Sequence, residues 1–410
     1  MKKYVILILF ASTISPLGAS GEEGLTLEQA VTIALQRTPE ILLAQKDMVT
    51  ATAKRLQMEA ISDPDIVFRD EGLSLKKNAS EGEGKEYSFG IEQGLEFPGK
   101  RALRGEIGRY GEEQAALELD KIRLLIGARV KKAYYKAVLS RRTLESLEKA
   151  AVLLDQFTEN LVIKYQAGTA SYSDVLRAKV EKARLQNQII EERREGTASR
   201  AEFNILLGRE GDEALNLSTD MAFIPLDKGL PDIKEEARTS SPALKLLASK
   251  RRQSEAGLRL ARKNTLPDFS LGLYFPSLRT GSWGFSVGLT VPLWRTRQKG
   301  EIMEADAANG IALISAENEE RRMMARIDSA YAGVKASEEQ VRIFEQKLLK
   351  DMEDEIRLAI SQYQYGKIEF FNLLDLYRTY AATQLEHLKA LYLYLVSRAD
   401  LEVAGEEYAD

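Results

Sequence analysis

Residues 363–376 read Y-Q-Y-G-K-I-E-F-F-N-L-L-D-L, and residues 165–176 read Y-Q-A-G-T-A-S-Y-S-D-V-L. In both segments a glycine, Gly366 or Gly168, lies between two long runs with apolar residues at helical spacing. Glycine adopts a positive φ without a Cβ clash, so it commonly follows the last turn of a helix where the chain changes direction. The two segments therefore predict the tips of two long helical hairpins in an internally duplicated chain.

Proline positions show where long helices can form. After Pro16, the prolines stand at positions 39, 64, 98, 225, 231, 242, 267, 276 and 292. Because proline in a helix interior costs about 3 kcal/mol or more, long continuous helices are expected in the proline-free stretches 99–224 and 293–410. A single helix over residues 100–165 would be about 100 Å long at 1.5 Å per residue.

Apolar residues inside both stretches recur in steps of three, four or seven, which is the pattern of a coiled-coil seam. The run before the first tip is Leu144, Leu147, Ala151, Leu154, Leu161 and Tyr165. The runs around the second tip are Ile327, Tyr331, Val334, Val341 and Leu348 before it, and Leu374, Ala381, Leu385, Leu388, Tyr392, Leu395 and Ala399 after it.

The two halves of the chain match at several places, as a tandem duplication with later changes in loop length would leave them. Thr38-Pro39-Glu40 matches Ser241-Pro242-Ala243, and Asp63-Pro64-Asp65 matches Leu266-Pro267-Asp268, each 203 positions later. Pro98 matches Pro292 at an offset of 194, and Gly168 matches Gly366 at 198. We predict a first repeat at 21–210, a linker at 211–240, a second repeat at 241–402 and a C-terminal tail at 403–410.

Between the paired prolines, apolar residues alternate with small or polar ones, which is the period of a strand. The alternating runs are Phe269, Leu271, Leu273 and Phe275; Trp283, Phe285, Val287, Leu289 and Val291; and Tyr87, Phe89, Ile91, Leu95 and Phe97, with Gln93 as an exception. Two-faced runs of about ten residues are typical of transmembrane barrel strands. We predict β-hairpins at about 66–97 and 268–292.

A half-buried sheet in a soluble domain is the alternative interpretation of these strands, and the sequence leaves it open. Two strands in each repeat make four per chain, which are too few to close a barrel. A barrel would therefore need several chains.

The N-terminus predicts export. Lys2 and Lys3 precede an apolar run over residues 4–11, and Gly18, Ala19 and Ser20 supply small residues for cleavage, so residues 1–20 are expected to be a signal peptide. The chain has no cysteine, so we expect no lipid attached through a cysteine.

Composition excludes several function classes. The 410 residues carry 58 basic and 62 acidic side chains, a formal charge of −4, which argues against a nucleic-acid partner. Residues 94–101, G-L-E-F-P-G-K-R, differ from a phosphate-binding loop, because Arg101 replaces the magnesium-binding hydroxyl and Pro98 removes a backbone N–H. A single histidine, His387, and no cysteine offer no converging metal ligands. We predict no catalytic, cofactor or metal site, and no enzyme.

The order of helix, β-hairpin, long helix, tip and long helix, twice over, resembles the TolC-like outer membrane efflux proteins. The two Y-x-x-G tips, followed six residues later by D-V-L or N-L-L, resemble that family too. Residues 91–103, I-E-Q-G-L-E-F-P-G-K-R-A-L, are similar to the strand-to-helix junction of its cobalt-zinc-cadmium branch. The resemblance covers the chain from about residue 25 to residue 401.

The resemblance implies a mainly α fold with a small transmembrane β part. It implies a homotrimer, in which four strands from each chain form a twelve-stranded barrel surrounded by outer membrane lipid, and the helices form a tunnel through the periplasm. The tips, with Tyr165, Gly168, Tyr363 and Gly366, would meet a periplasmic adaptor (membrane fusion) protein and an inner-membrane efflux transporter.

In the resembling family, acidic residues six and nine positions after the tip glycine narrow the entrance. The second tip has Asn372 and Asp375 at these positions, and the first has Asp174 and Arg177. The resemblance thus implies a pore constriction at Asp375, Asn372 and Asp174. The alternative is that Asp375 is an ordinary solvated helix charge.

The expected function is an outer membrane exit duct for heavy-metal cations or small toxic compounds. Two alternatives remain from the sequence: a duct for type I protein secretion, and an exported coiled-coil structural protein without a channel. Since the duct has no predicted metal site, selectivity would belong to the pump.

Overall fold

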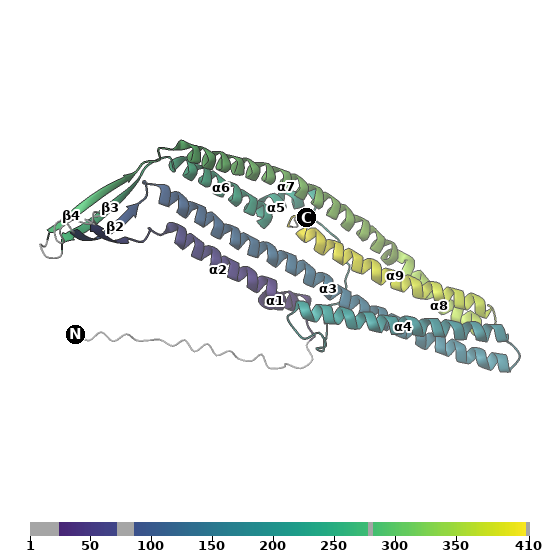
Figure 1. Cartoon of the computed structure of the whole chain (residues 1–410). Coiled ribbons are helices and arrows are strands. Elements are labelled where there is room, and N and C mark those ends of the chain that lie inside the picture. The colour runs from purple at the N-terminus through teal and green to yellow at the C-terminus, as the bar shows by residue number, and fades with distance from the viewer. Residues whose placement is uncertain (1–23, 72–85, 278–281, 407–410) are drawn as a thin grey trace, which may run out of the picture.

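The computed structural model describes residues 24–71, 86–277 and 282–406, and the predicted signal peptide lies outside them. The molecule is elongated, with four strands at one end and two helical tips at the other (Figure 1). The first half contains α1 (Leu27–Arg37), α2 (Pro39–Glu59), β1 (Asp65–Glu71), β2 (Glu86–Leu95), α3 (Lys100–Gln166) and α4 (Tyr172–Leu206). The second half contains α5 (Leu230–Ser240), α6 (Pro242–Lys263), β3 (Asp268–Ser277), β4 (Ser282–Thr290), α7 (Arg295–Ile343), the π-helical turn η1 (Phe344–Leu348), α8 (Leu349–Gln364) and α9 (Phe370–Val403).

The two halves repeat the same order of elements. Each starts with a short helix that ends just before a proline, Pro39 or Pro242, and this proline opens the next helix. Proline disfavours helical backbone in the residue before it but fits the first turn of a helix. The matched prolines therefore break each helical arm at the same place.

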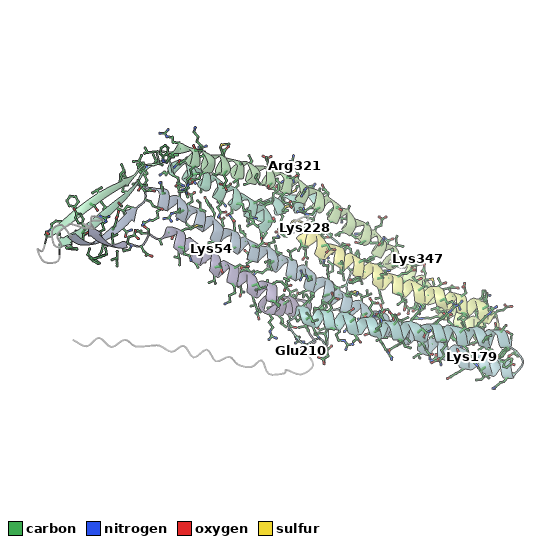
Figure 2. The ribbon with its side chains drawn as sticks, in the orientation of Figure 1. Lys54, Lys179, Glu210, Lys228, Arg321 and Lys347 are labelled. Atoms are coloured by element: carbon green, nitrogen blue, oxygen red, sulfur yellow. The ribbon has the colours of Figure 1, made fainter. Side chains whose placement is uncertain are left out.

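The long helix α3 confirms the first predicted rod, because its 67 residues are one uninterrupted helix. Of its predicted seam, Leu147, Leu154 and Leu161 are buried, at most 4% exposed, whereas Tyr165 at the tip is 43% exposed. Charged side chains such as Lys54 and Lys179 stand away from the helices (Figure 2).

The second rod is not one continuous α-helix, so that prediction is wrong at residues 344–348. A π-helical turn lies there, and Leu348, predicted in the seam, is 39% exposed. A π turn places one extra residue in a helical turn. The seam therefore passes from the buried Val341 to the half-buried Leu349 in a step of eight, and continues at the buried Ile356 and Tyr363 in steps of seven.

Both tips have the predicted glycine geometry. Gly168 has φ +73° and Gly366 has φ +72°. In each tip the amide three residues past the last helical residue donates to a carbonyl five residues back, Thr169 to Lys164 and Lys367 to Gln362. This is the Schellman arrangement, which satisfies the last carbonyls of the helix.

The four strands form one antiparallel sheet in the order β1-β2-β3-β4. The pairing aligns apolar residues on one face, for example Ile66 with Ile91 and Leu273 with Phe285. This face is uncovered, and Phe285 is 73% exposed. The other face is mostly small, and the Tyr274 ring lies where a Cβ on Gly284 would be, within 2.6 Å.

The predicted linker at 211–240 is an ordered part of the fold. It contains α5, and Leu217 and Met221 are buried in the core. The predicted C-terminal tail also begins with packed residues, because Glu406 is 4% exposed and its Oε2 accepts a hydrogen bond of 3.0 Å from the amide of Ala243 at the start of α6.

Replacing Gly366 by alanine should weaken the second tip, because a left-handed conformation costs a non-glycine residue about 1–2 kcal/mol. Amides of residues 359–366 should then exchange hydrogen about fivefold faster, since 1 kcal/mol is roughly a fivefold population change. Gly257→Ala is the matched control, because a Cβ there meets nothing within 4 Å and alanine favours a helix. Equal exchange in both variants would contradict the strained-tip assignment.

Candidate functional site

The two tips lie together at the end of the molecule opposite the sheet, where α3, α4, α8 and α9 meet (Figure 1). Their buried side chains form one cluster that joins both repeats, including Leu161, Val175, Tyr363 and Leu374. This cluster is separate from the larger core near the middle of the molecule. The tips are therefore held as one packed unit.

The two tip tyrosines occupy different environments although their sequence positions match. Tyr165 is exposed, and its ring lies 5.9 Å from that of Tyr172. Tyr363 is 7% exposed and packs against Phe370, with ring centroids 5.8 Å apart. Burial raises the pKa of the Tyr363 hydroxyl, and the nearby carboxylate of Asp174 raises it further.

Several polar contacts tie the first hairpin to the second. The Lys164 ammonium donates to the Tyr363 carbonyl over 2.9 Å and lies 4.0 Å from the centre of its ring. The Arg177 guanidinium lies 5.2 Å from the ring of Phe371, a cation–π contact. Each contact joins residues almost two hundred positions apart.

The third tie is an ion pair. Arg378 on α9 donates through Nε to Glu181 on α4 over 2.9 Å, and a second guanidinium nitrogen contacts the same oxygen. Next to it, the Tyr377 hydroxyl donates to the Ala150 carbonyl over 2.8 Å. Burial raises the pKa of Tyr377, and the carboxylates of Glu181 and Asp155 add to this rise. A neutral, hydrogen-bonded tyrosine thus lies between two hairpins joined by a charged pair.

The predicted constriction residues are only partly brought together. Asn372 and Asp375 are exposed and three residues apart on α9, so they share one face of the helix. Among the described residues, the Asp375 carboxylate has no ion-pair partner within 4 Å. Asp174 lies in the first turn of α4, whose N-cap is Ser171: the Asp174 amide donates to Ser171 Oγ over 3.1 Å, and its carboxylate accepts from that hydroxyl.

The two lateral edges of the molecule carry surfaces that the sequence reasoning missed. Contacts run from α2 to α3, α3 to α6 and α6 to α7, so α2 and α7 are the outer helices beside the sheet. Each has an exposed apolar stripe, formed by Leu42, Val49 and Leu56 on α2, and by Met303, Ile311 and Ile314 on α7. The heptad spacing 42, 49 and 56 was the available signal. Strands β1 and β4 likewise leave one edge unpaired among the described residues.

The residues that resemble a phosphate-binding loop serve the strand-to-helix junction. Lys100 is 5% exposed, and its ammonium donates to the Leu266 carbonyl over 3.0 Å and to Asp268 Oδ1 over 2.8 Å. Asp268 Oδ1 also accepts from the Phe97 amide over 2.7 Å. The lysine thus binds the second repeat to the first.

The described residues contain neither a membrane-spanning helix nor a metal-binding cluster. None of their helices is long and apolar enough to cross a membrane. Across 24–71, 86–277 and 282–406 no group of three or more histidine or carboxylate side chains is placed to hold a metal ion.

Comparison with known proteins decides the family. The family described as outer membrane efflux protein matches residues 30–209 and 233–404, one segment in each repeat. The chain belongs to this family. The resemblance found in the sequence is confirmed, and so is the predicted fold class of duplicated long-helix hairpins with four strands per chain.

Individual relatives are distant but cover the chain. The cobalt-zinc-cadmium resistance protein CzcC of Cupriavidus metallidurans is 20% identical over 375 residues, which are 90% of this chain and 86% of CzcC. A membrane protein from Pseudomonas aeruginosa superimposes with a TM-score of 0.79 at 17% identity, covering 92% of this chain and 93% of that one. CusC, whose structures concern transmembrane channel formation, gives 0.77 at 17% identity, with 92% and 91% covered.

Arg378→Met should loosen the two hairpins from each other, because it leaves Glu181 without its partner. Amides over residues 174–185 and 371–381 should exchange hydrogen several-fold faster, as expected when a partly buried ion pair is broken. Arg357→Met is the matched control, since the partner of Arg357, Glu353, lies on its own helix. If the tip amides exchanged hydrogen at the same rate in both variants, the ion pair between Arg378 and Glu181 would not hold the hairpins together.

Proposed function

We propose that this protein is the outer membrane exit duct of a tripartite efflux system, extending into the periplasm and conducting passively. The observation that carries this proposal is that each lateral edge of the molecule has an outer strand with an unpaired side and an outer helix with an exposed apolar stripe. One edge presents β1 and the α2 stripe, and the other presents β4 and the α7 stripe. The predicted signal peptide supports export, and no lipid anchor through cysteine is expected.

Closing these edges gives a ring of copies, and the homotrimer implied by the family resemblance is the ring that we propose. Unpaired backbone groups cannot face hydrocarbon, because each costs several kcal/mol there. Pairing β4 of one copy with β1 of the next, and α7 with α2, is a head-to-tail contact that closes into a ring. Three copies would give a twelve-stranded barrel whose uncovered apolar face, with Phe68 and Phe285, contacts outer membrane lipid.

The exposed apolar face argues against the soluble alternative. Such a sheet would cover its apolar side with a helix or a second sheet, whereas Phe285 and Trp283 are 73% and 67% exposed. An exported coiled-coil structural protein is likewise excluded by membership in the efflux family.

The tips supply a surface for the adaptor protein and, through it, for the inner-membrane transporter. Tyr365 is 77% exposed, Tyr172 61% and Phe371 50%, all at or beside the tip turns. Exposed aromatic side chains in one place mark an interaction site. Tyr165 and the two turn glycines lie within the same end, whereas Tyr363 supports it from the interior.

The cargo is proposed from the named relative. CzcC is a cobalt-zinc-cadmium resistance protein, so heavy-metal cations are the first candidates and small toxic compounds the second. The chain has one histidine and no cysteine, so the duct itself would not select a metal, and selection would belong to the pump. A duct for type I protein secretion would have a similar wall and stays the alternative function.

A cysteine pair tests the ring of copies. Arg252 and Glu113 form an ion pair of 3.0 Å between α6 and α3, and by the repeat offsets of 203 and 194 their counterparts are Val49 on α2 and Ala307 on α7. We expect Val49→Cys with Ala307→Cys to link neighbouring copies on oxidation. The natural chain has no cysteine, so the background is clean.

Disulfide-linked dimers and closed trimers on a non-reducing gel would support the ring. Either single variant should stay unlinked. Val49→Cys with Glu317→Cys is the matched control, because ten helical residues place the second cysteine about 15 Å further along α7. A monomer that remains unlinked in outer membranes would contradict the proposed assembly.

Asp375 tests the constriction. Three carboxylates around one pore attract cations, so Asp375→Ala should weaken block by a multivalent cation about tenfold in planar bilayers, as loss of a charged ring predicts. Asp354→Ala, an exposed carboxylate on α8 away from the tip turn, should leave the block unchanged. Unchanged block in Asp375→Ala would make Asp375 an ordinary solvated charge.

A further inference from the structure

The π-helical turn η1 distinguishes the second repeat from the first. Its five residues, Phe344–Leu348, interrupt the helix that leads to the second tip. The matching helix of the first repeat, α3, is unbroken. π turns are rare and often occur at functional sites. The unbroken helix α3 of the first repeat serves as an internal comparison for the second repeat. The turn is the point at which α8 and its tip could move relative to α7.

The only histidine of the chain faces this turn from α9. His387 Nε2 lies 3.6 Å from Glu345 Oε1, and its ring centroid lies 6.0 Å from that of Phe344. The His387 side chain is 18% exposed. Its Nε2 is buried and makes no hydrogen bond within the described part of the chain. A separation of 3.6 Å is too long for a neutral hydrogen bond, but it suits an ion pair.

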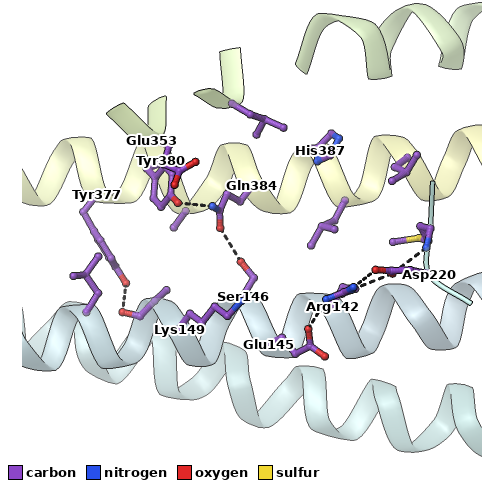
Figure 3. A pocket seen from close by; sticks show the side chains of 17 residues that line it. Arg142, Glu145, Ser146, Lys149, Asp220, Glu353, Tyr377, Tyr380, Gln384 and His387 are labelled. Atoms are coloured by element: carbon purple, nitrogen blue, oxygen red, sulfur yellow. Dashed lines mark hydrogen bonds and ion pairs between the residues drawn. The ribbon is translucent and has the colours of Figure 1, made fainter. Parts of the chain in front are cut away.

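His387 also lines a cavity of about 640 Å³ between α3, α8 and α9, which is shown in Figure 3. The charged groups that line it are Arg142, Glu145 and Lys149 on α3, Asp220 on the segment after α4, and Glu353 on α8.

Most of these charges are already engaged. Arg142 donates to Asp220 over 3.0 Å and to Glu145 over 3.0 Å, and Glu353 pairs with Arg357. Glu345 has no ion pair among the described residues other than the contact with His387. A positive charge on His387 would therefore find its nearest available partner in the π turn.

We propose that His387 and Glu345 form a pH-sensitive clamp that stiffens the π turn when His387 is protonated. Histidine side chains ordinarily change charge between about pH 5 and 8. A protonated imidazole pairs with the Glu345 carboxylate 3.6 Å away, whereas a neutral imidazole offers that carboxylate no charge. Resting on the proposed duct function, the clamp would hold the second hairpin in the conformation described above and oppose opening of the tip in acid.

Hydrogen exchange tests the clamp on the full-length, assembled protein in detergent. Amides of residues 342–350 should exchange about threefold more slowly in the natural protein than in His387→Gln near pH 5.5, the effect of a single ion pair. Near pH 8, at the upper end of the range in which histidine side chains ordinarily change charge, the two proteins should exchange equally. Comparing variants at one pH removes the intrinsic pH dependence of exchange.

Two carboxylate variants identify the partner. Glu345→Gln should abolish the acid-dependent protection, whereas Glu353→Gln, which lines the same cavity, should retain it. Equal exchange of natural protein and His387→Gln near pH 5.5, loss of protection in Glu353→Gln instead of Glu345→Gln, or a difference that persists at pH 8 would each overturn the clamp. Hydrogen exchange can be measured whether or not the protein conducts. A failure of the proposed duct function would therefore be detected separately, by measuring conductance in planar bilayers.

Discussion

Unpaired backbone groups along the outer edges of β1 and β4 constrain how the rest of the molecule is arranged. A sheet edge in water is a site of aggregation, and in hydrocarbon it is not tolerated. The four strands cannot close alone, so in the proposed duct the chain meets copies of itself edge to edge. The helices follow the same rule, because the layer α2, α3, α6 and α7 has apolar stripes on both outer helices. Strand edges and helix stripes thus specify the same neighbour.

Much of this fold could be predicted from the sequence, because its signals are periodic and repeated. The alternation from Trp283 to Leu289 gave β4, the freedom from proline gave α3, and the glycines Gly168 and Gly366 gave both tips. Because each signal occurs in both repeats, the prediction of each element was more specific than a single occurrence would allow. The offsets of the prolines also located the breaks at the starts of α2 and α6.

The features that escaped prediction depend on small departures from a period or on contacts across the fold. The step of eight from Val341 to Leu349 is a single added residue, which a search in steps of three, four or seven passes over. The different burial of Tyr165 and Tyr363 arises because Lys164 and Phe370 pack around one and not the other. The N-cap of α4 also depends on a local contact that no period predicts, because Ser171 Oγ accepts a hydrogen bond from the amide of Asp174.

The hydrogen bond from the Ala243 amide to Glu406 makes the start of α6 depend on a residue far away in the sequence. The first amides of α6 need acceptors, and one of them is satisfied by a carboxylate 163 positions later in the sequence. The start of α6 therefore completes this hydrogen bond only when α9 and the residues that follow it have packed against it.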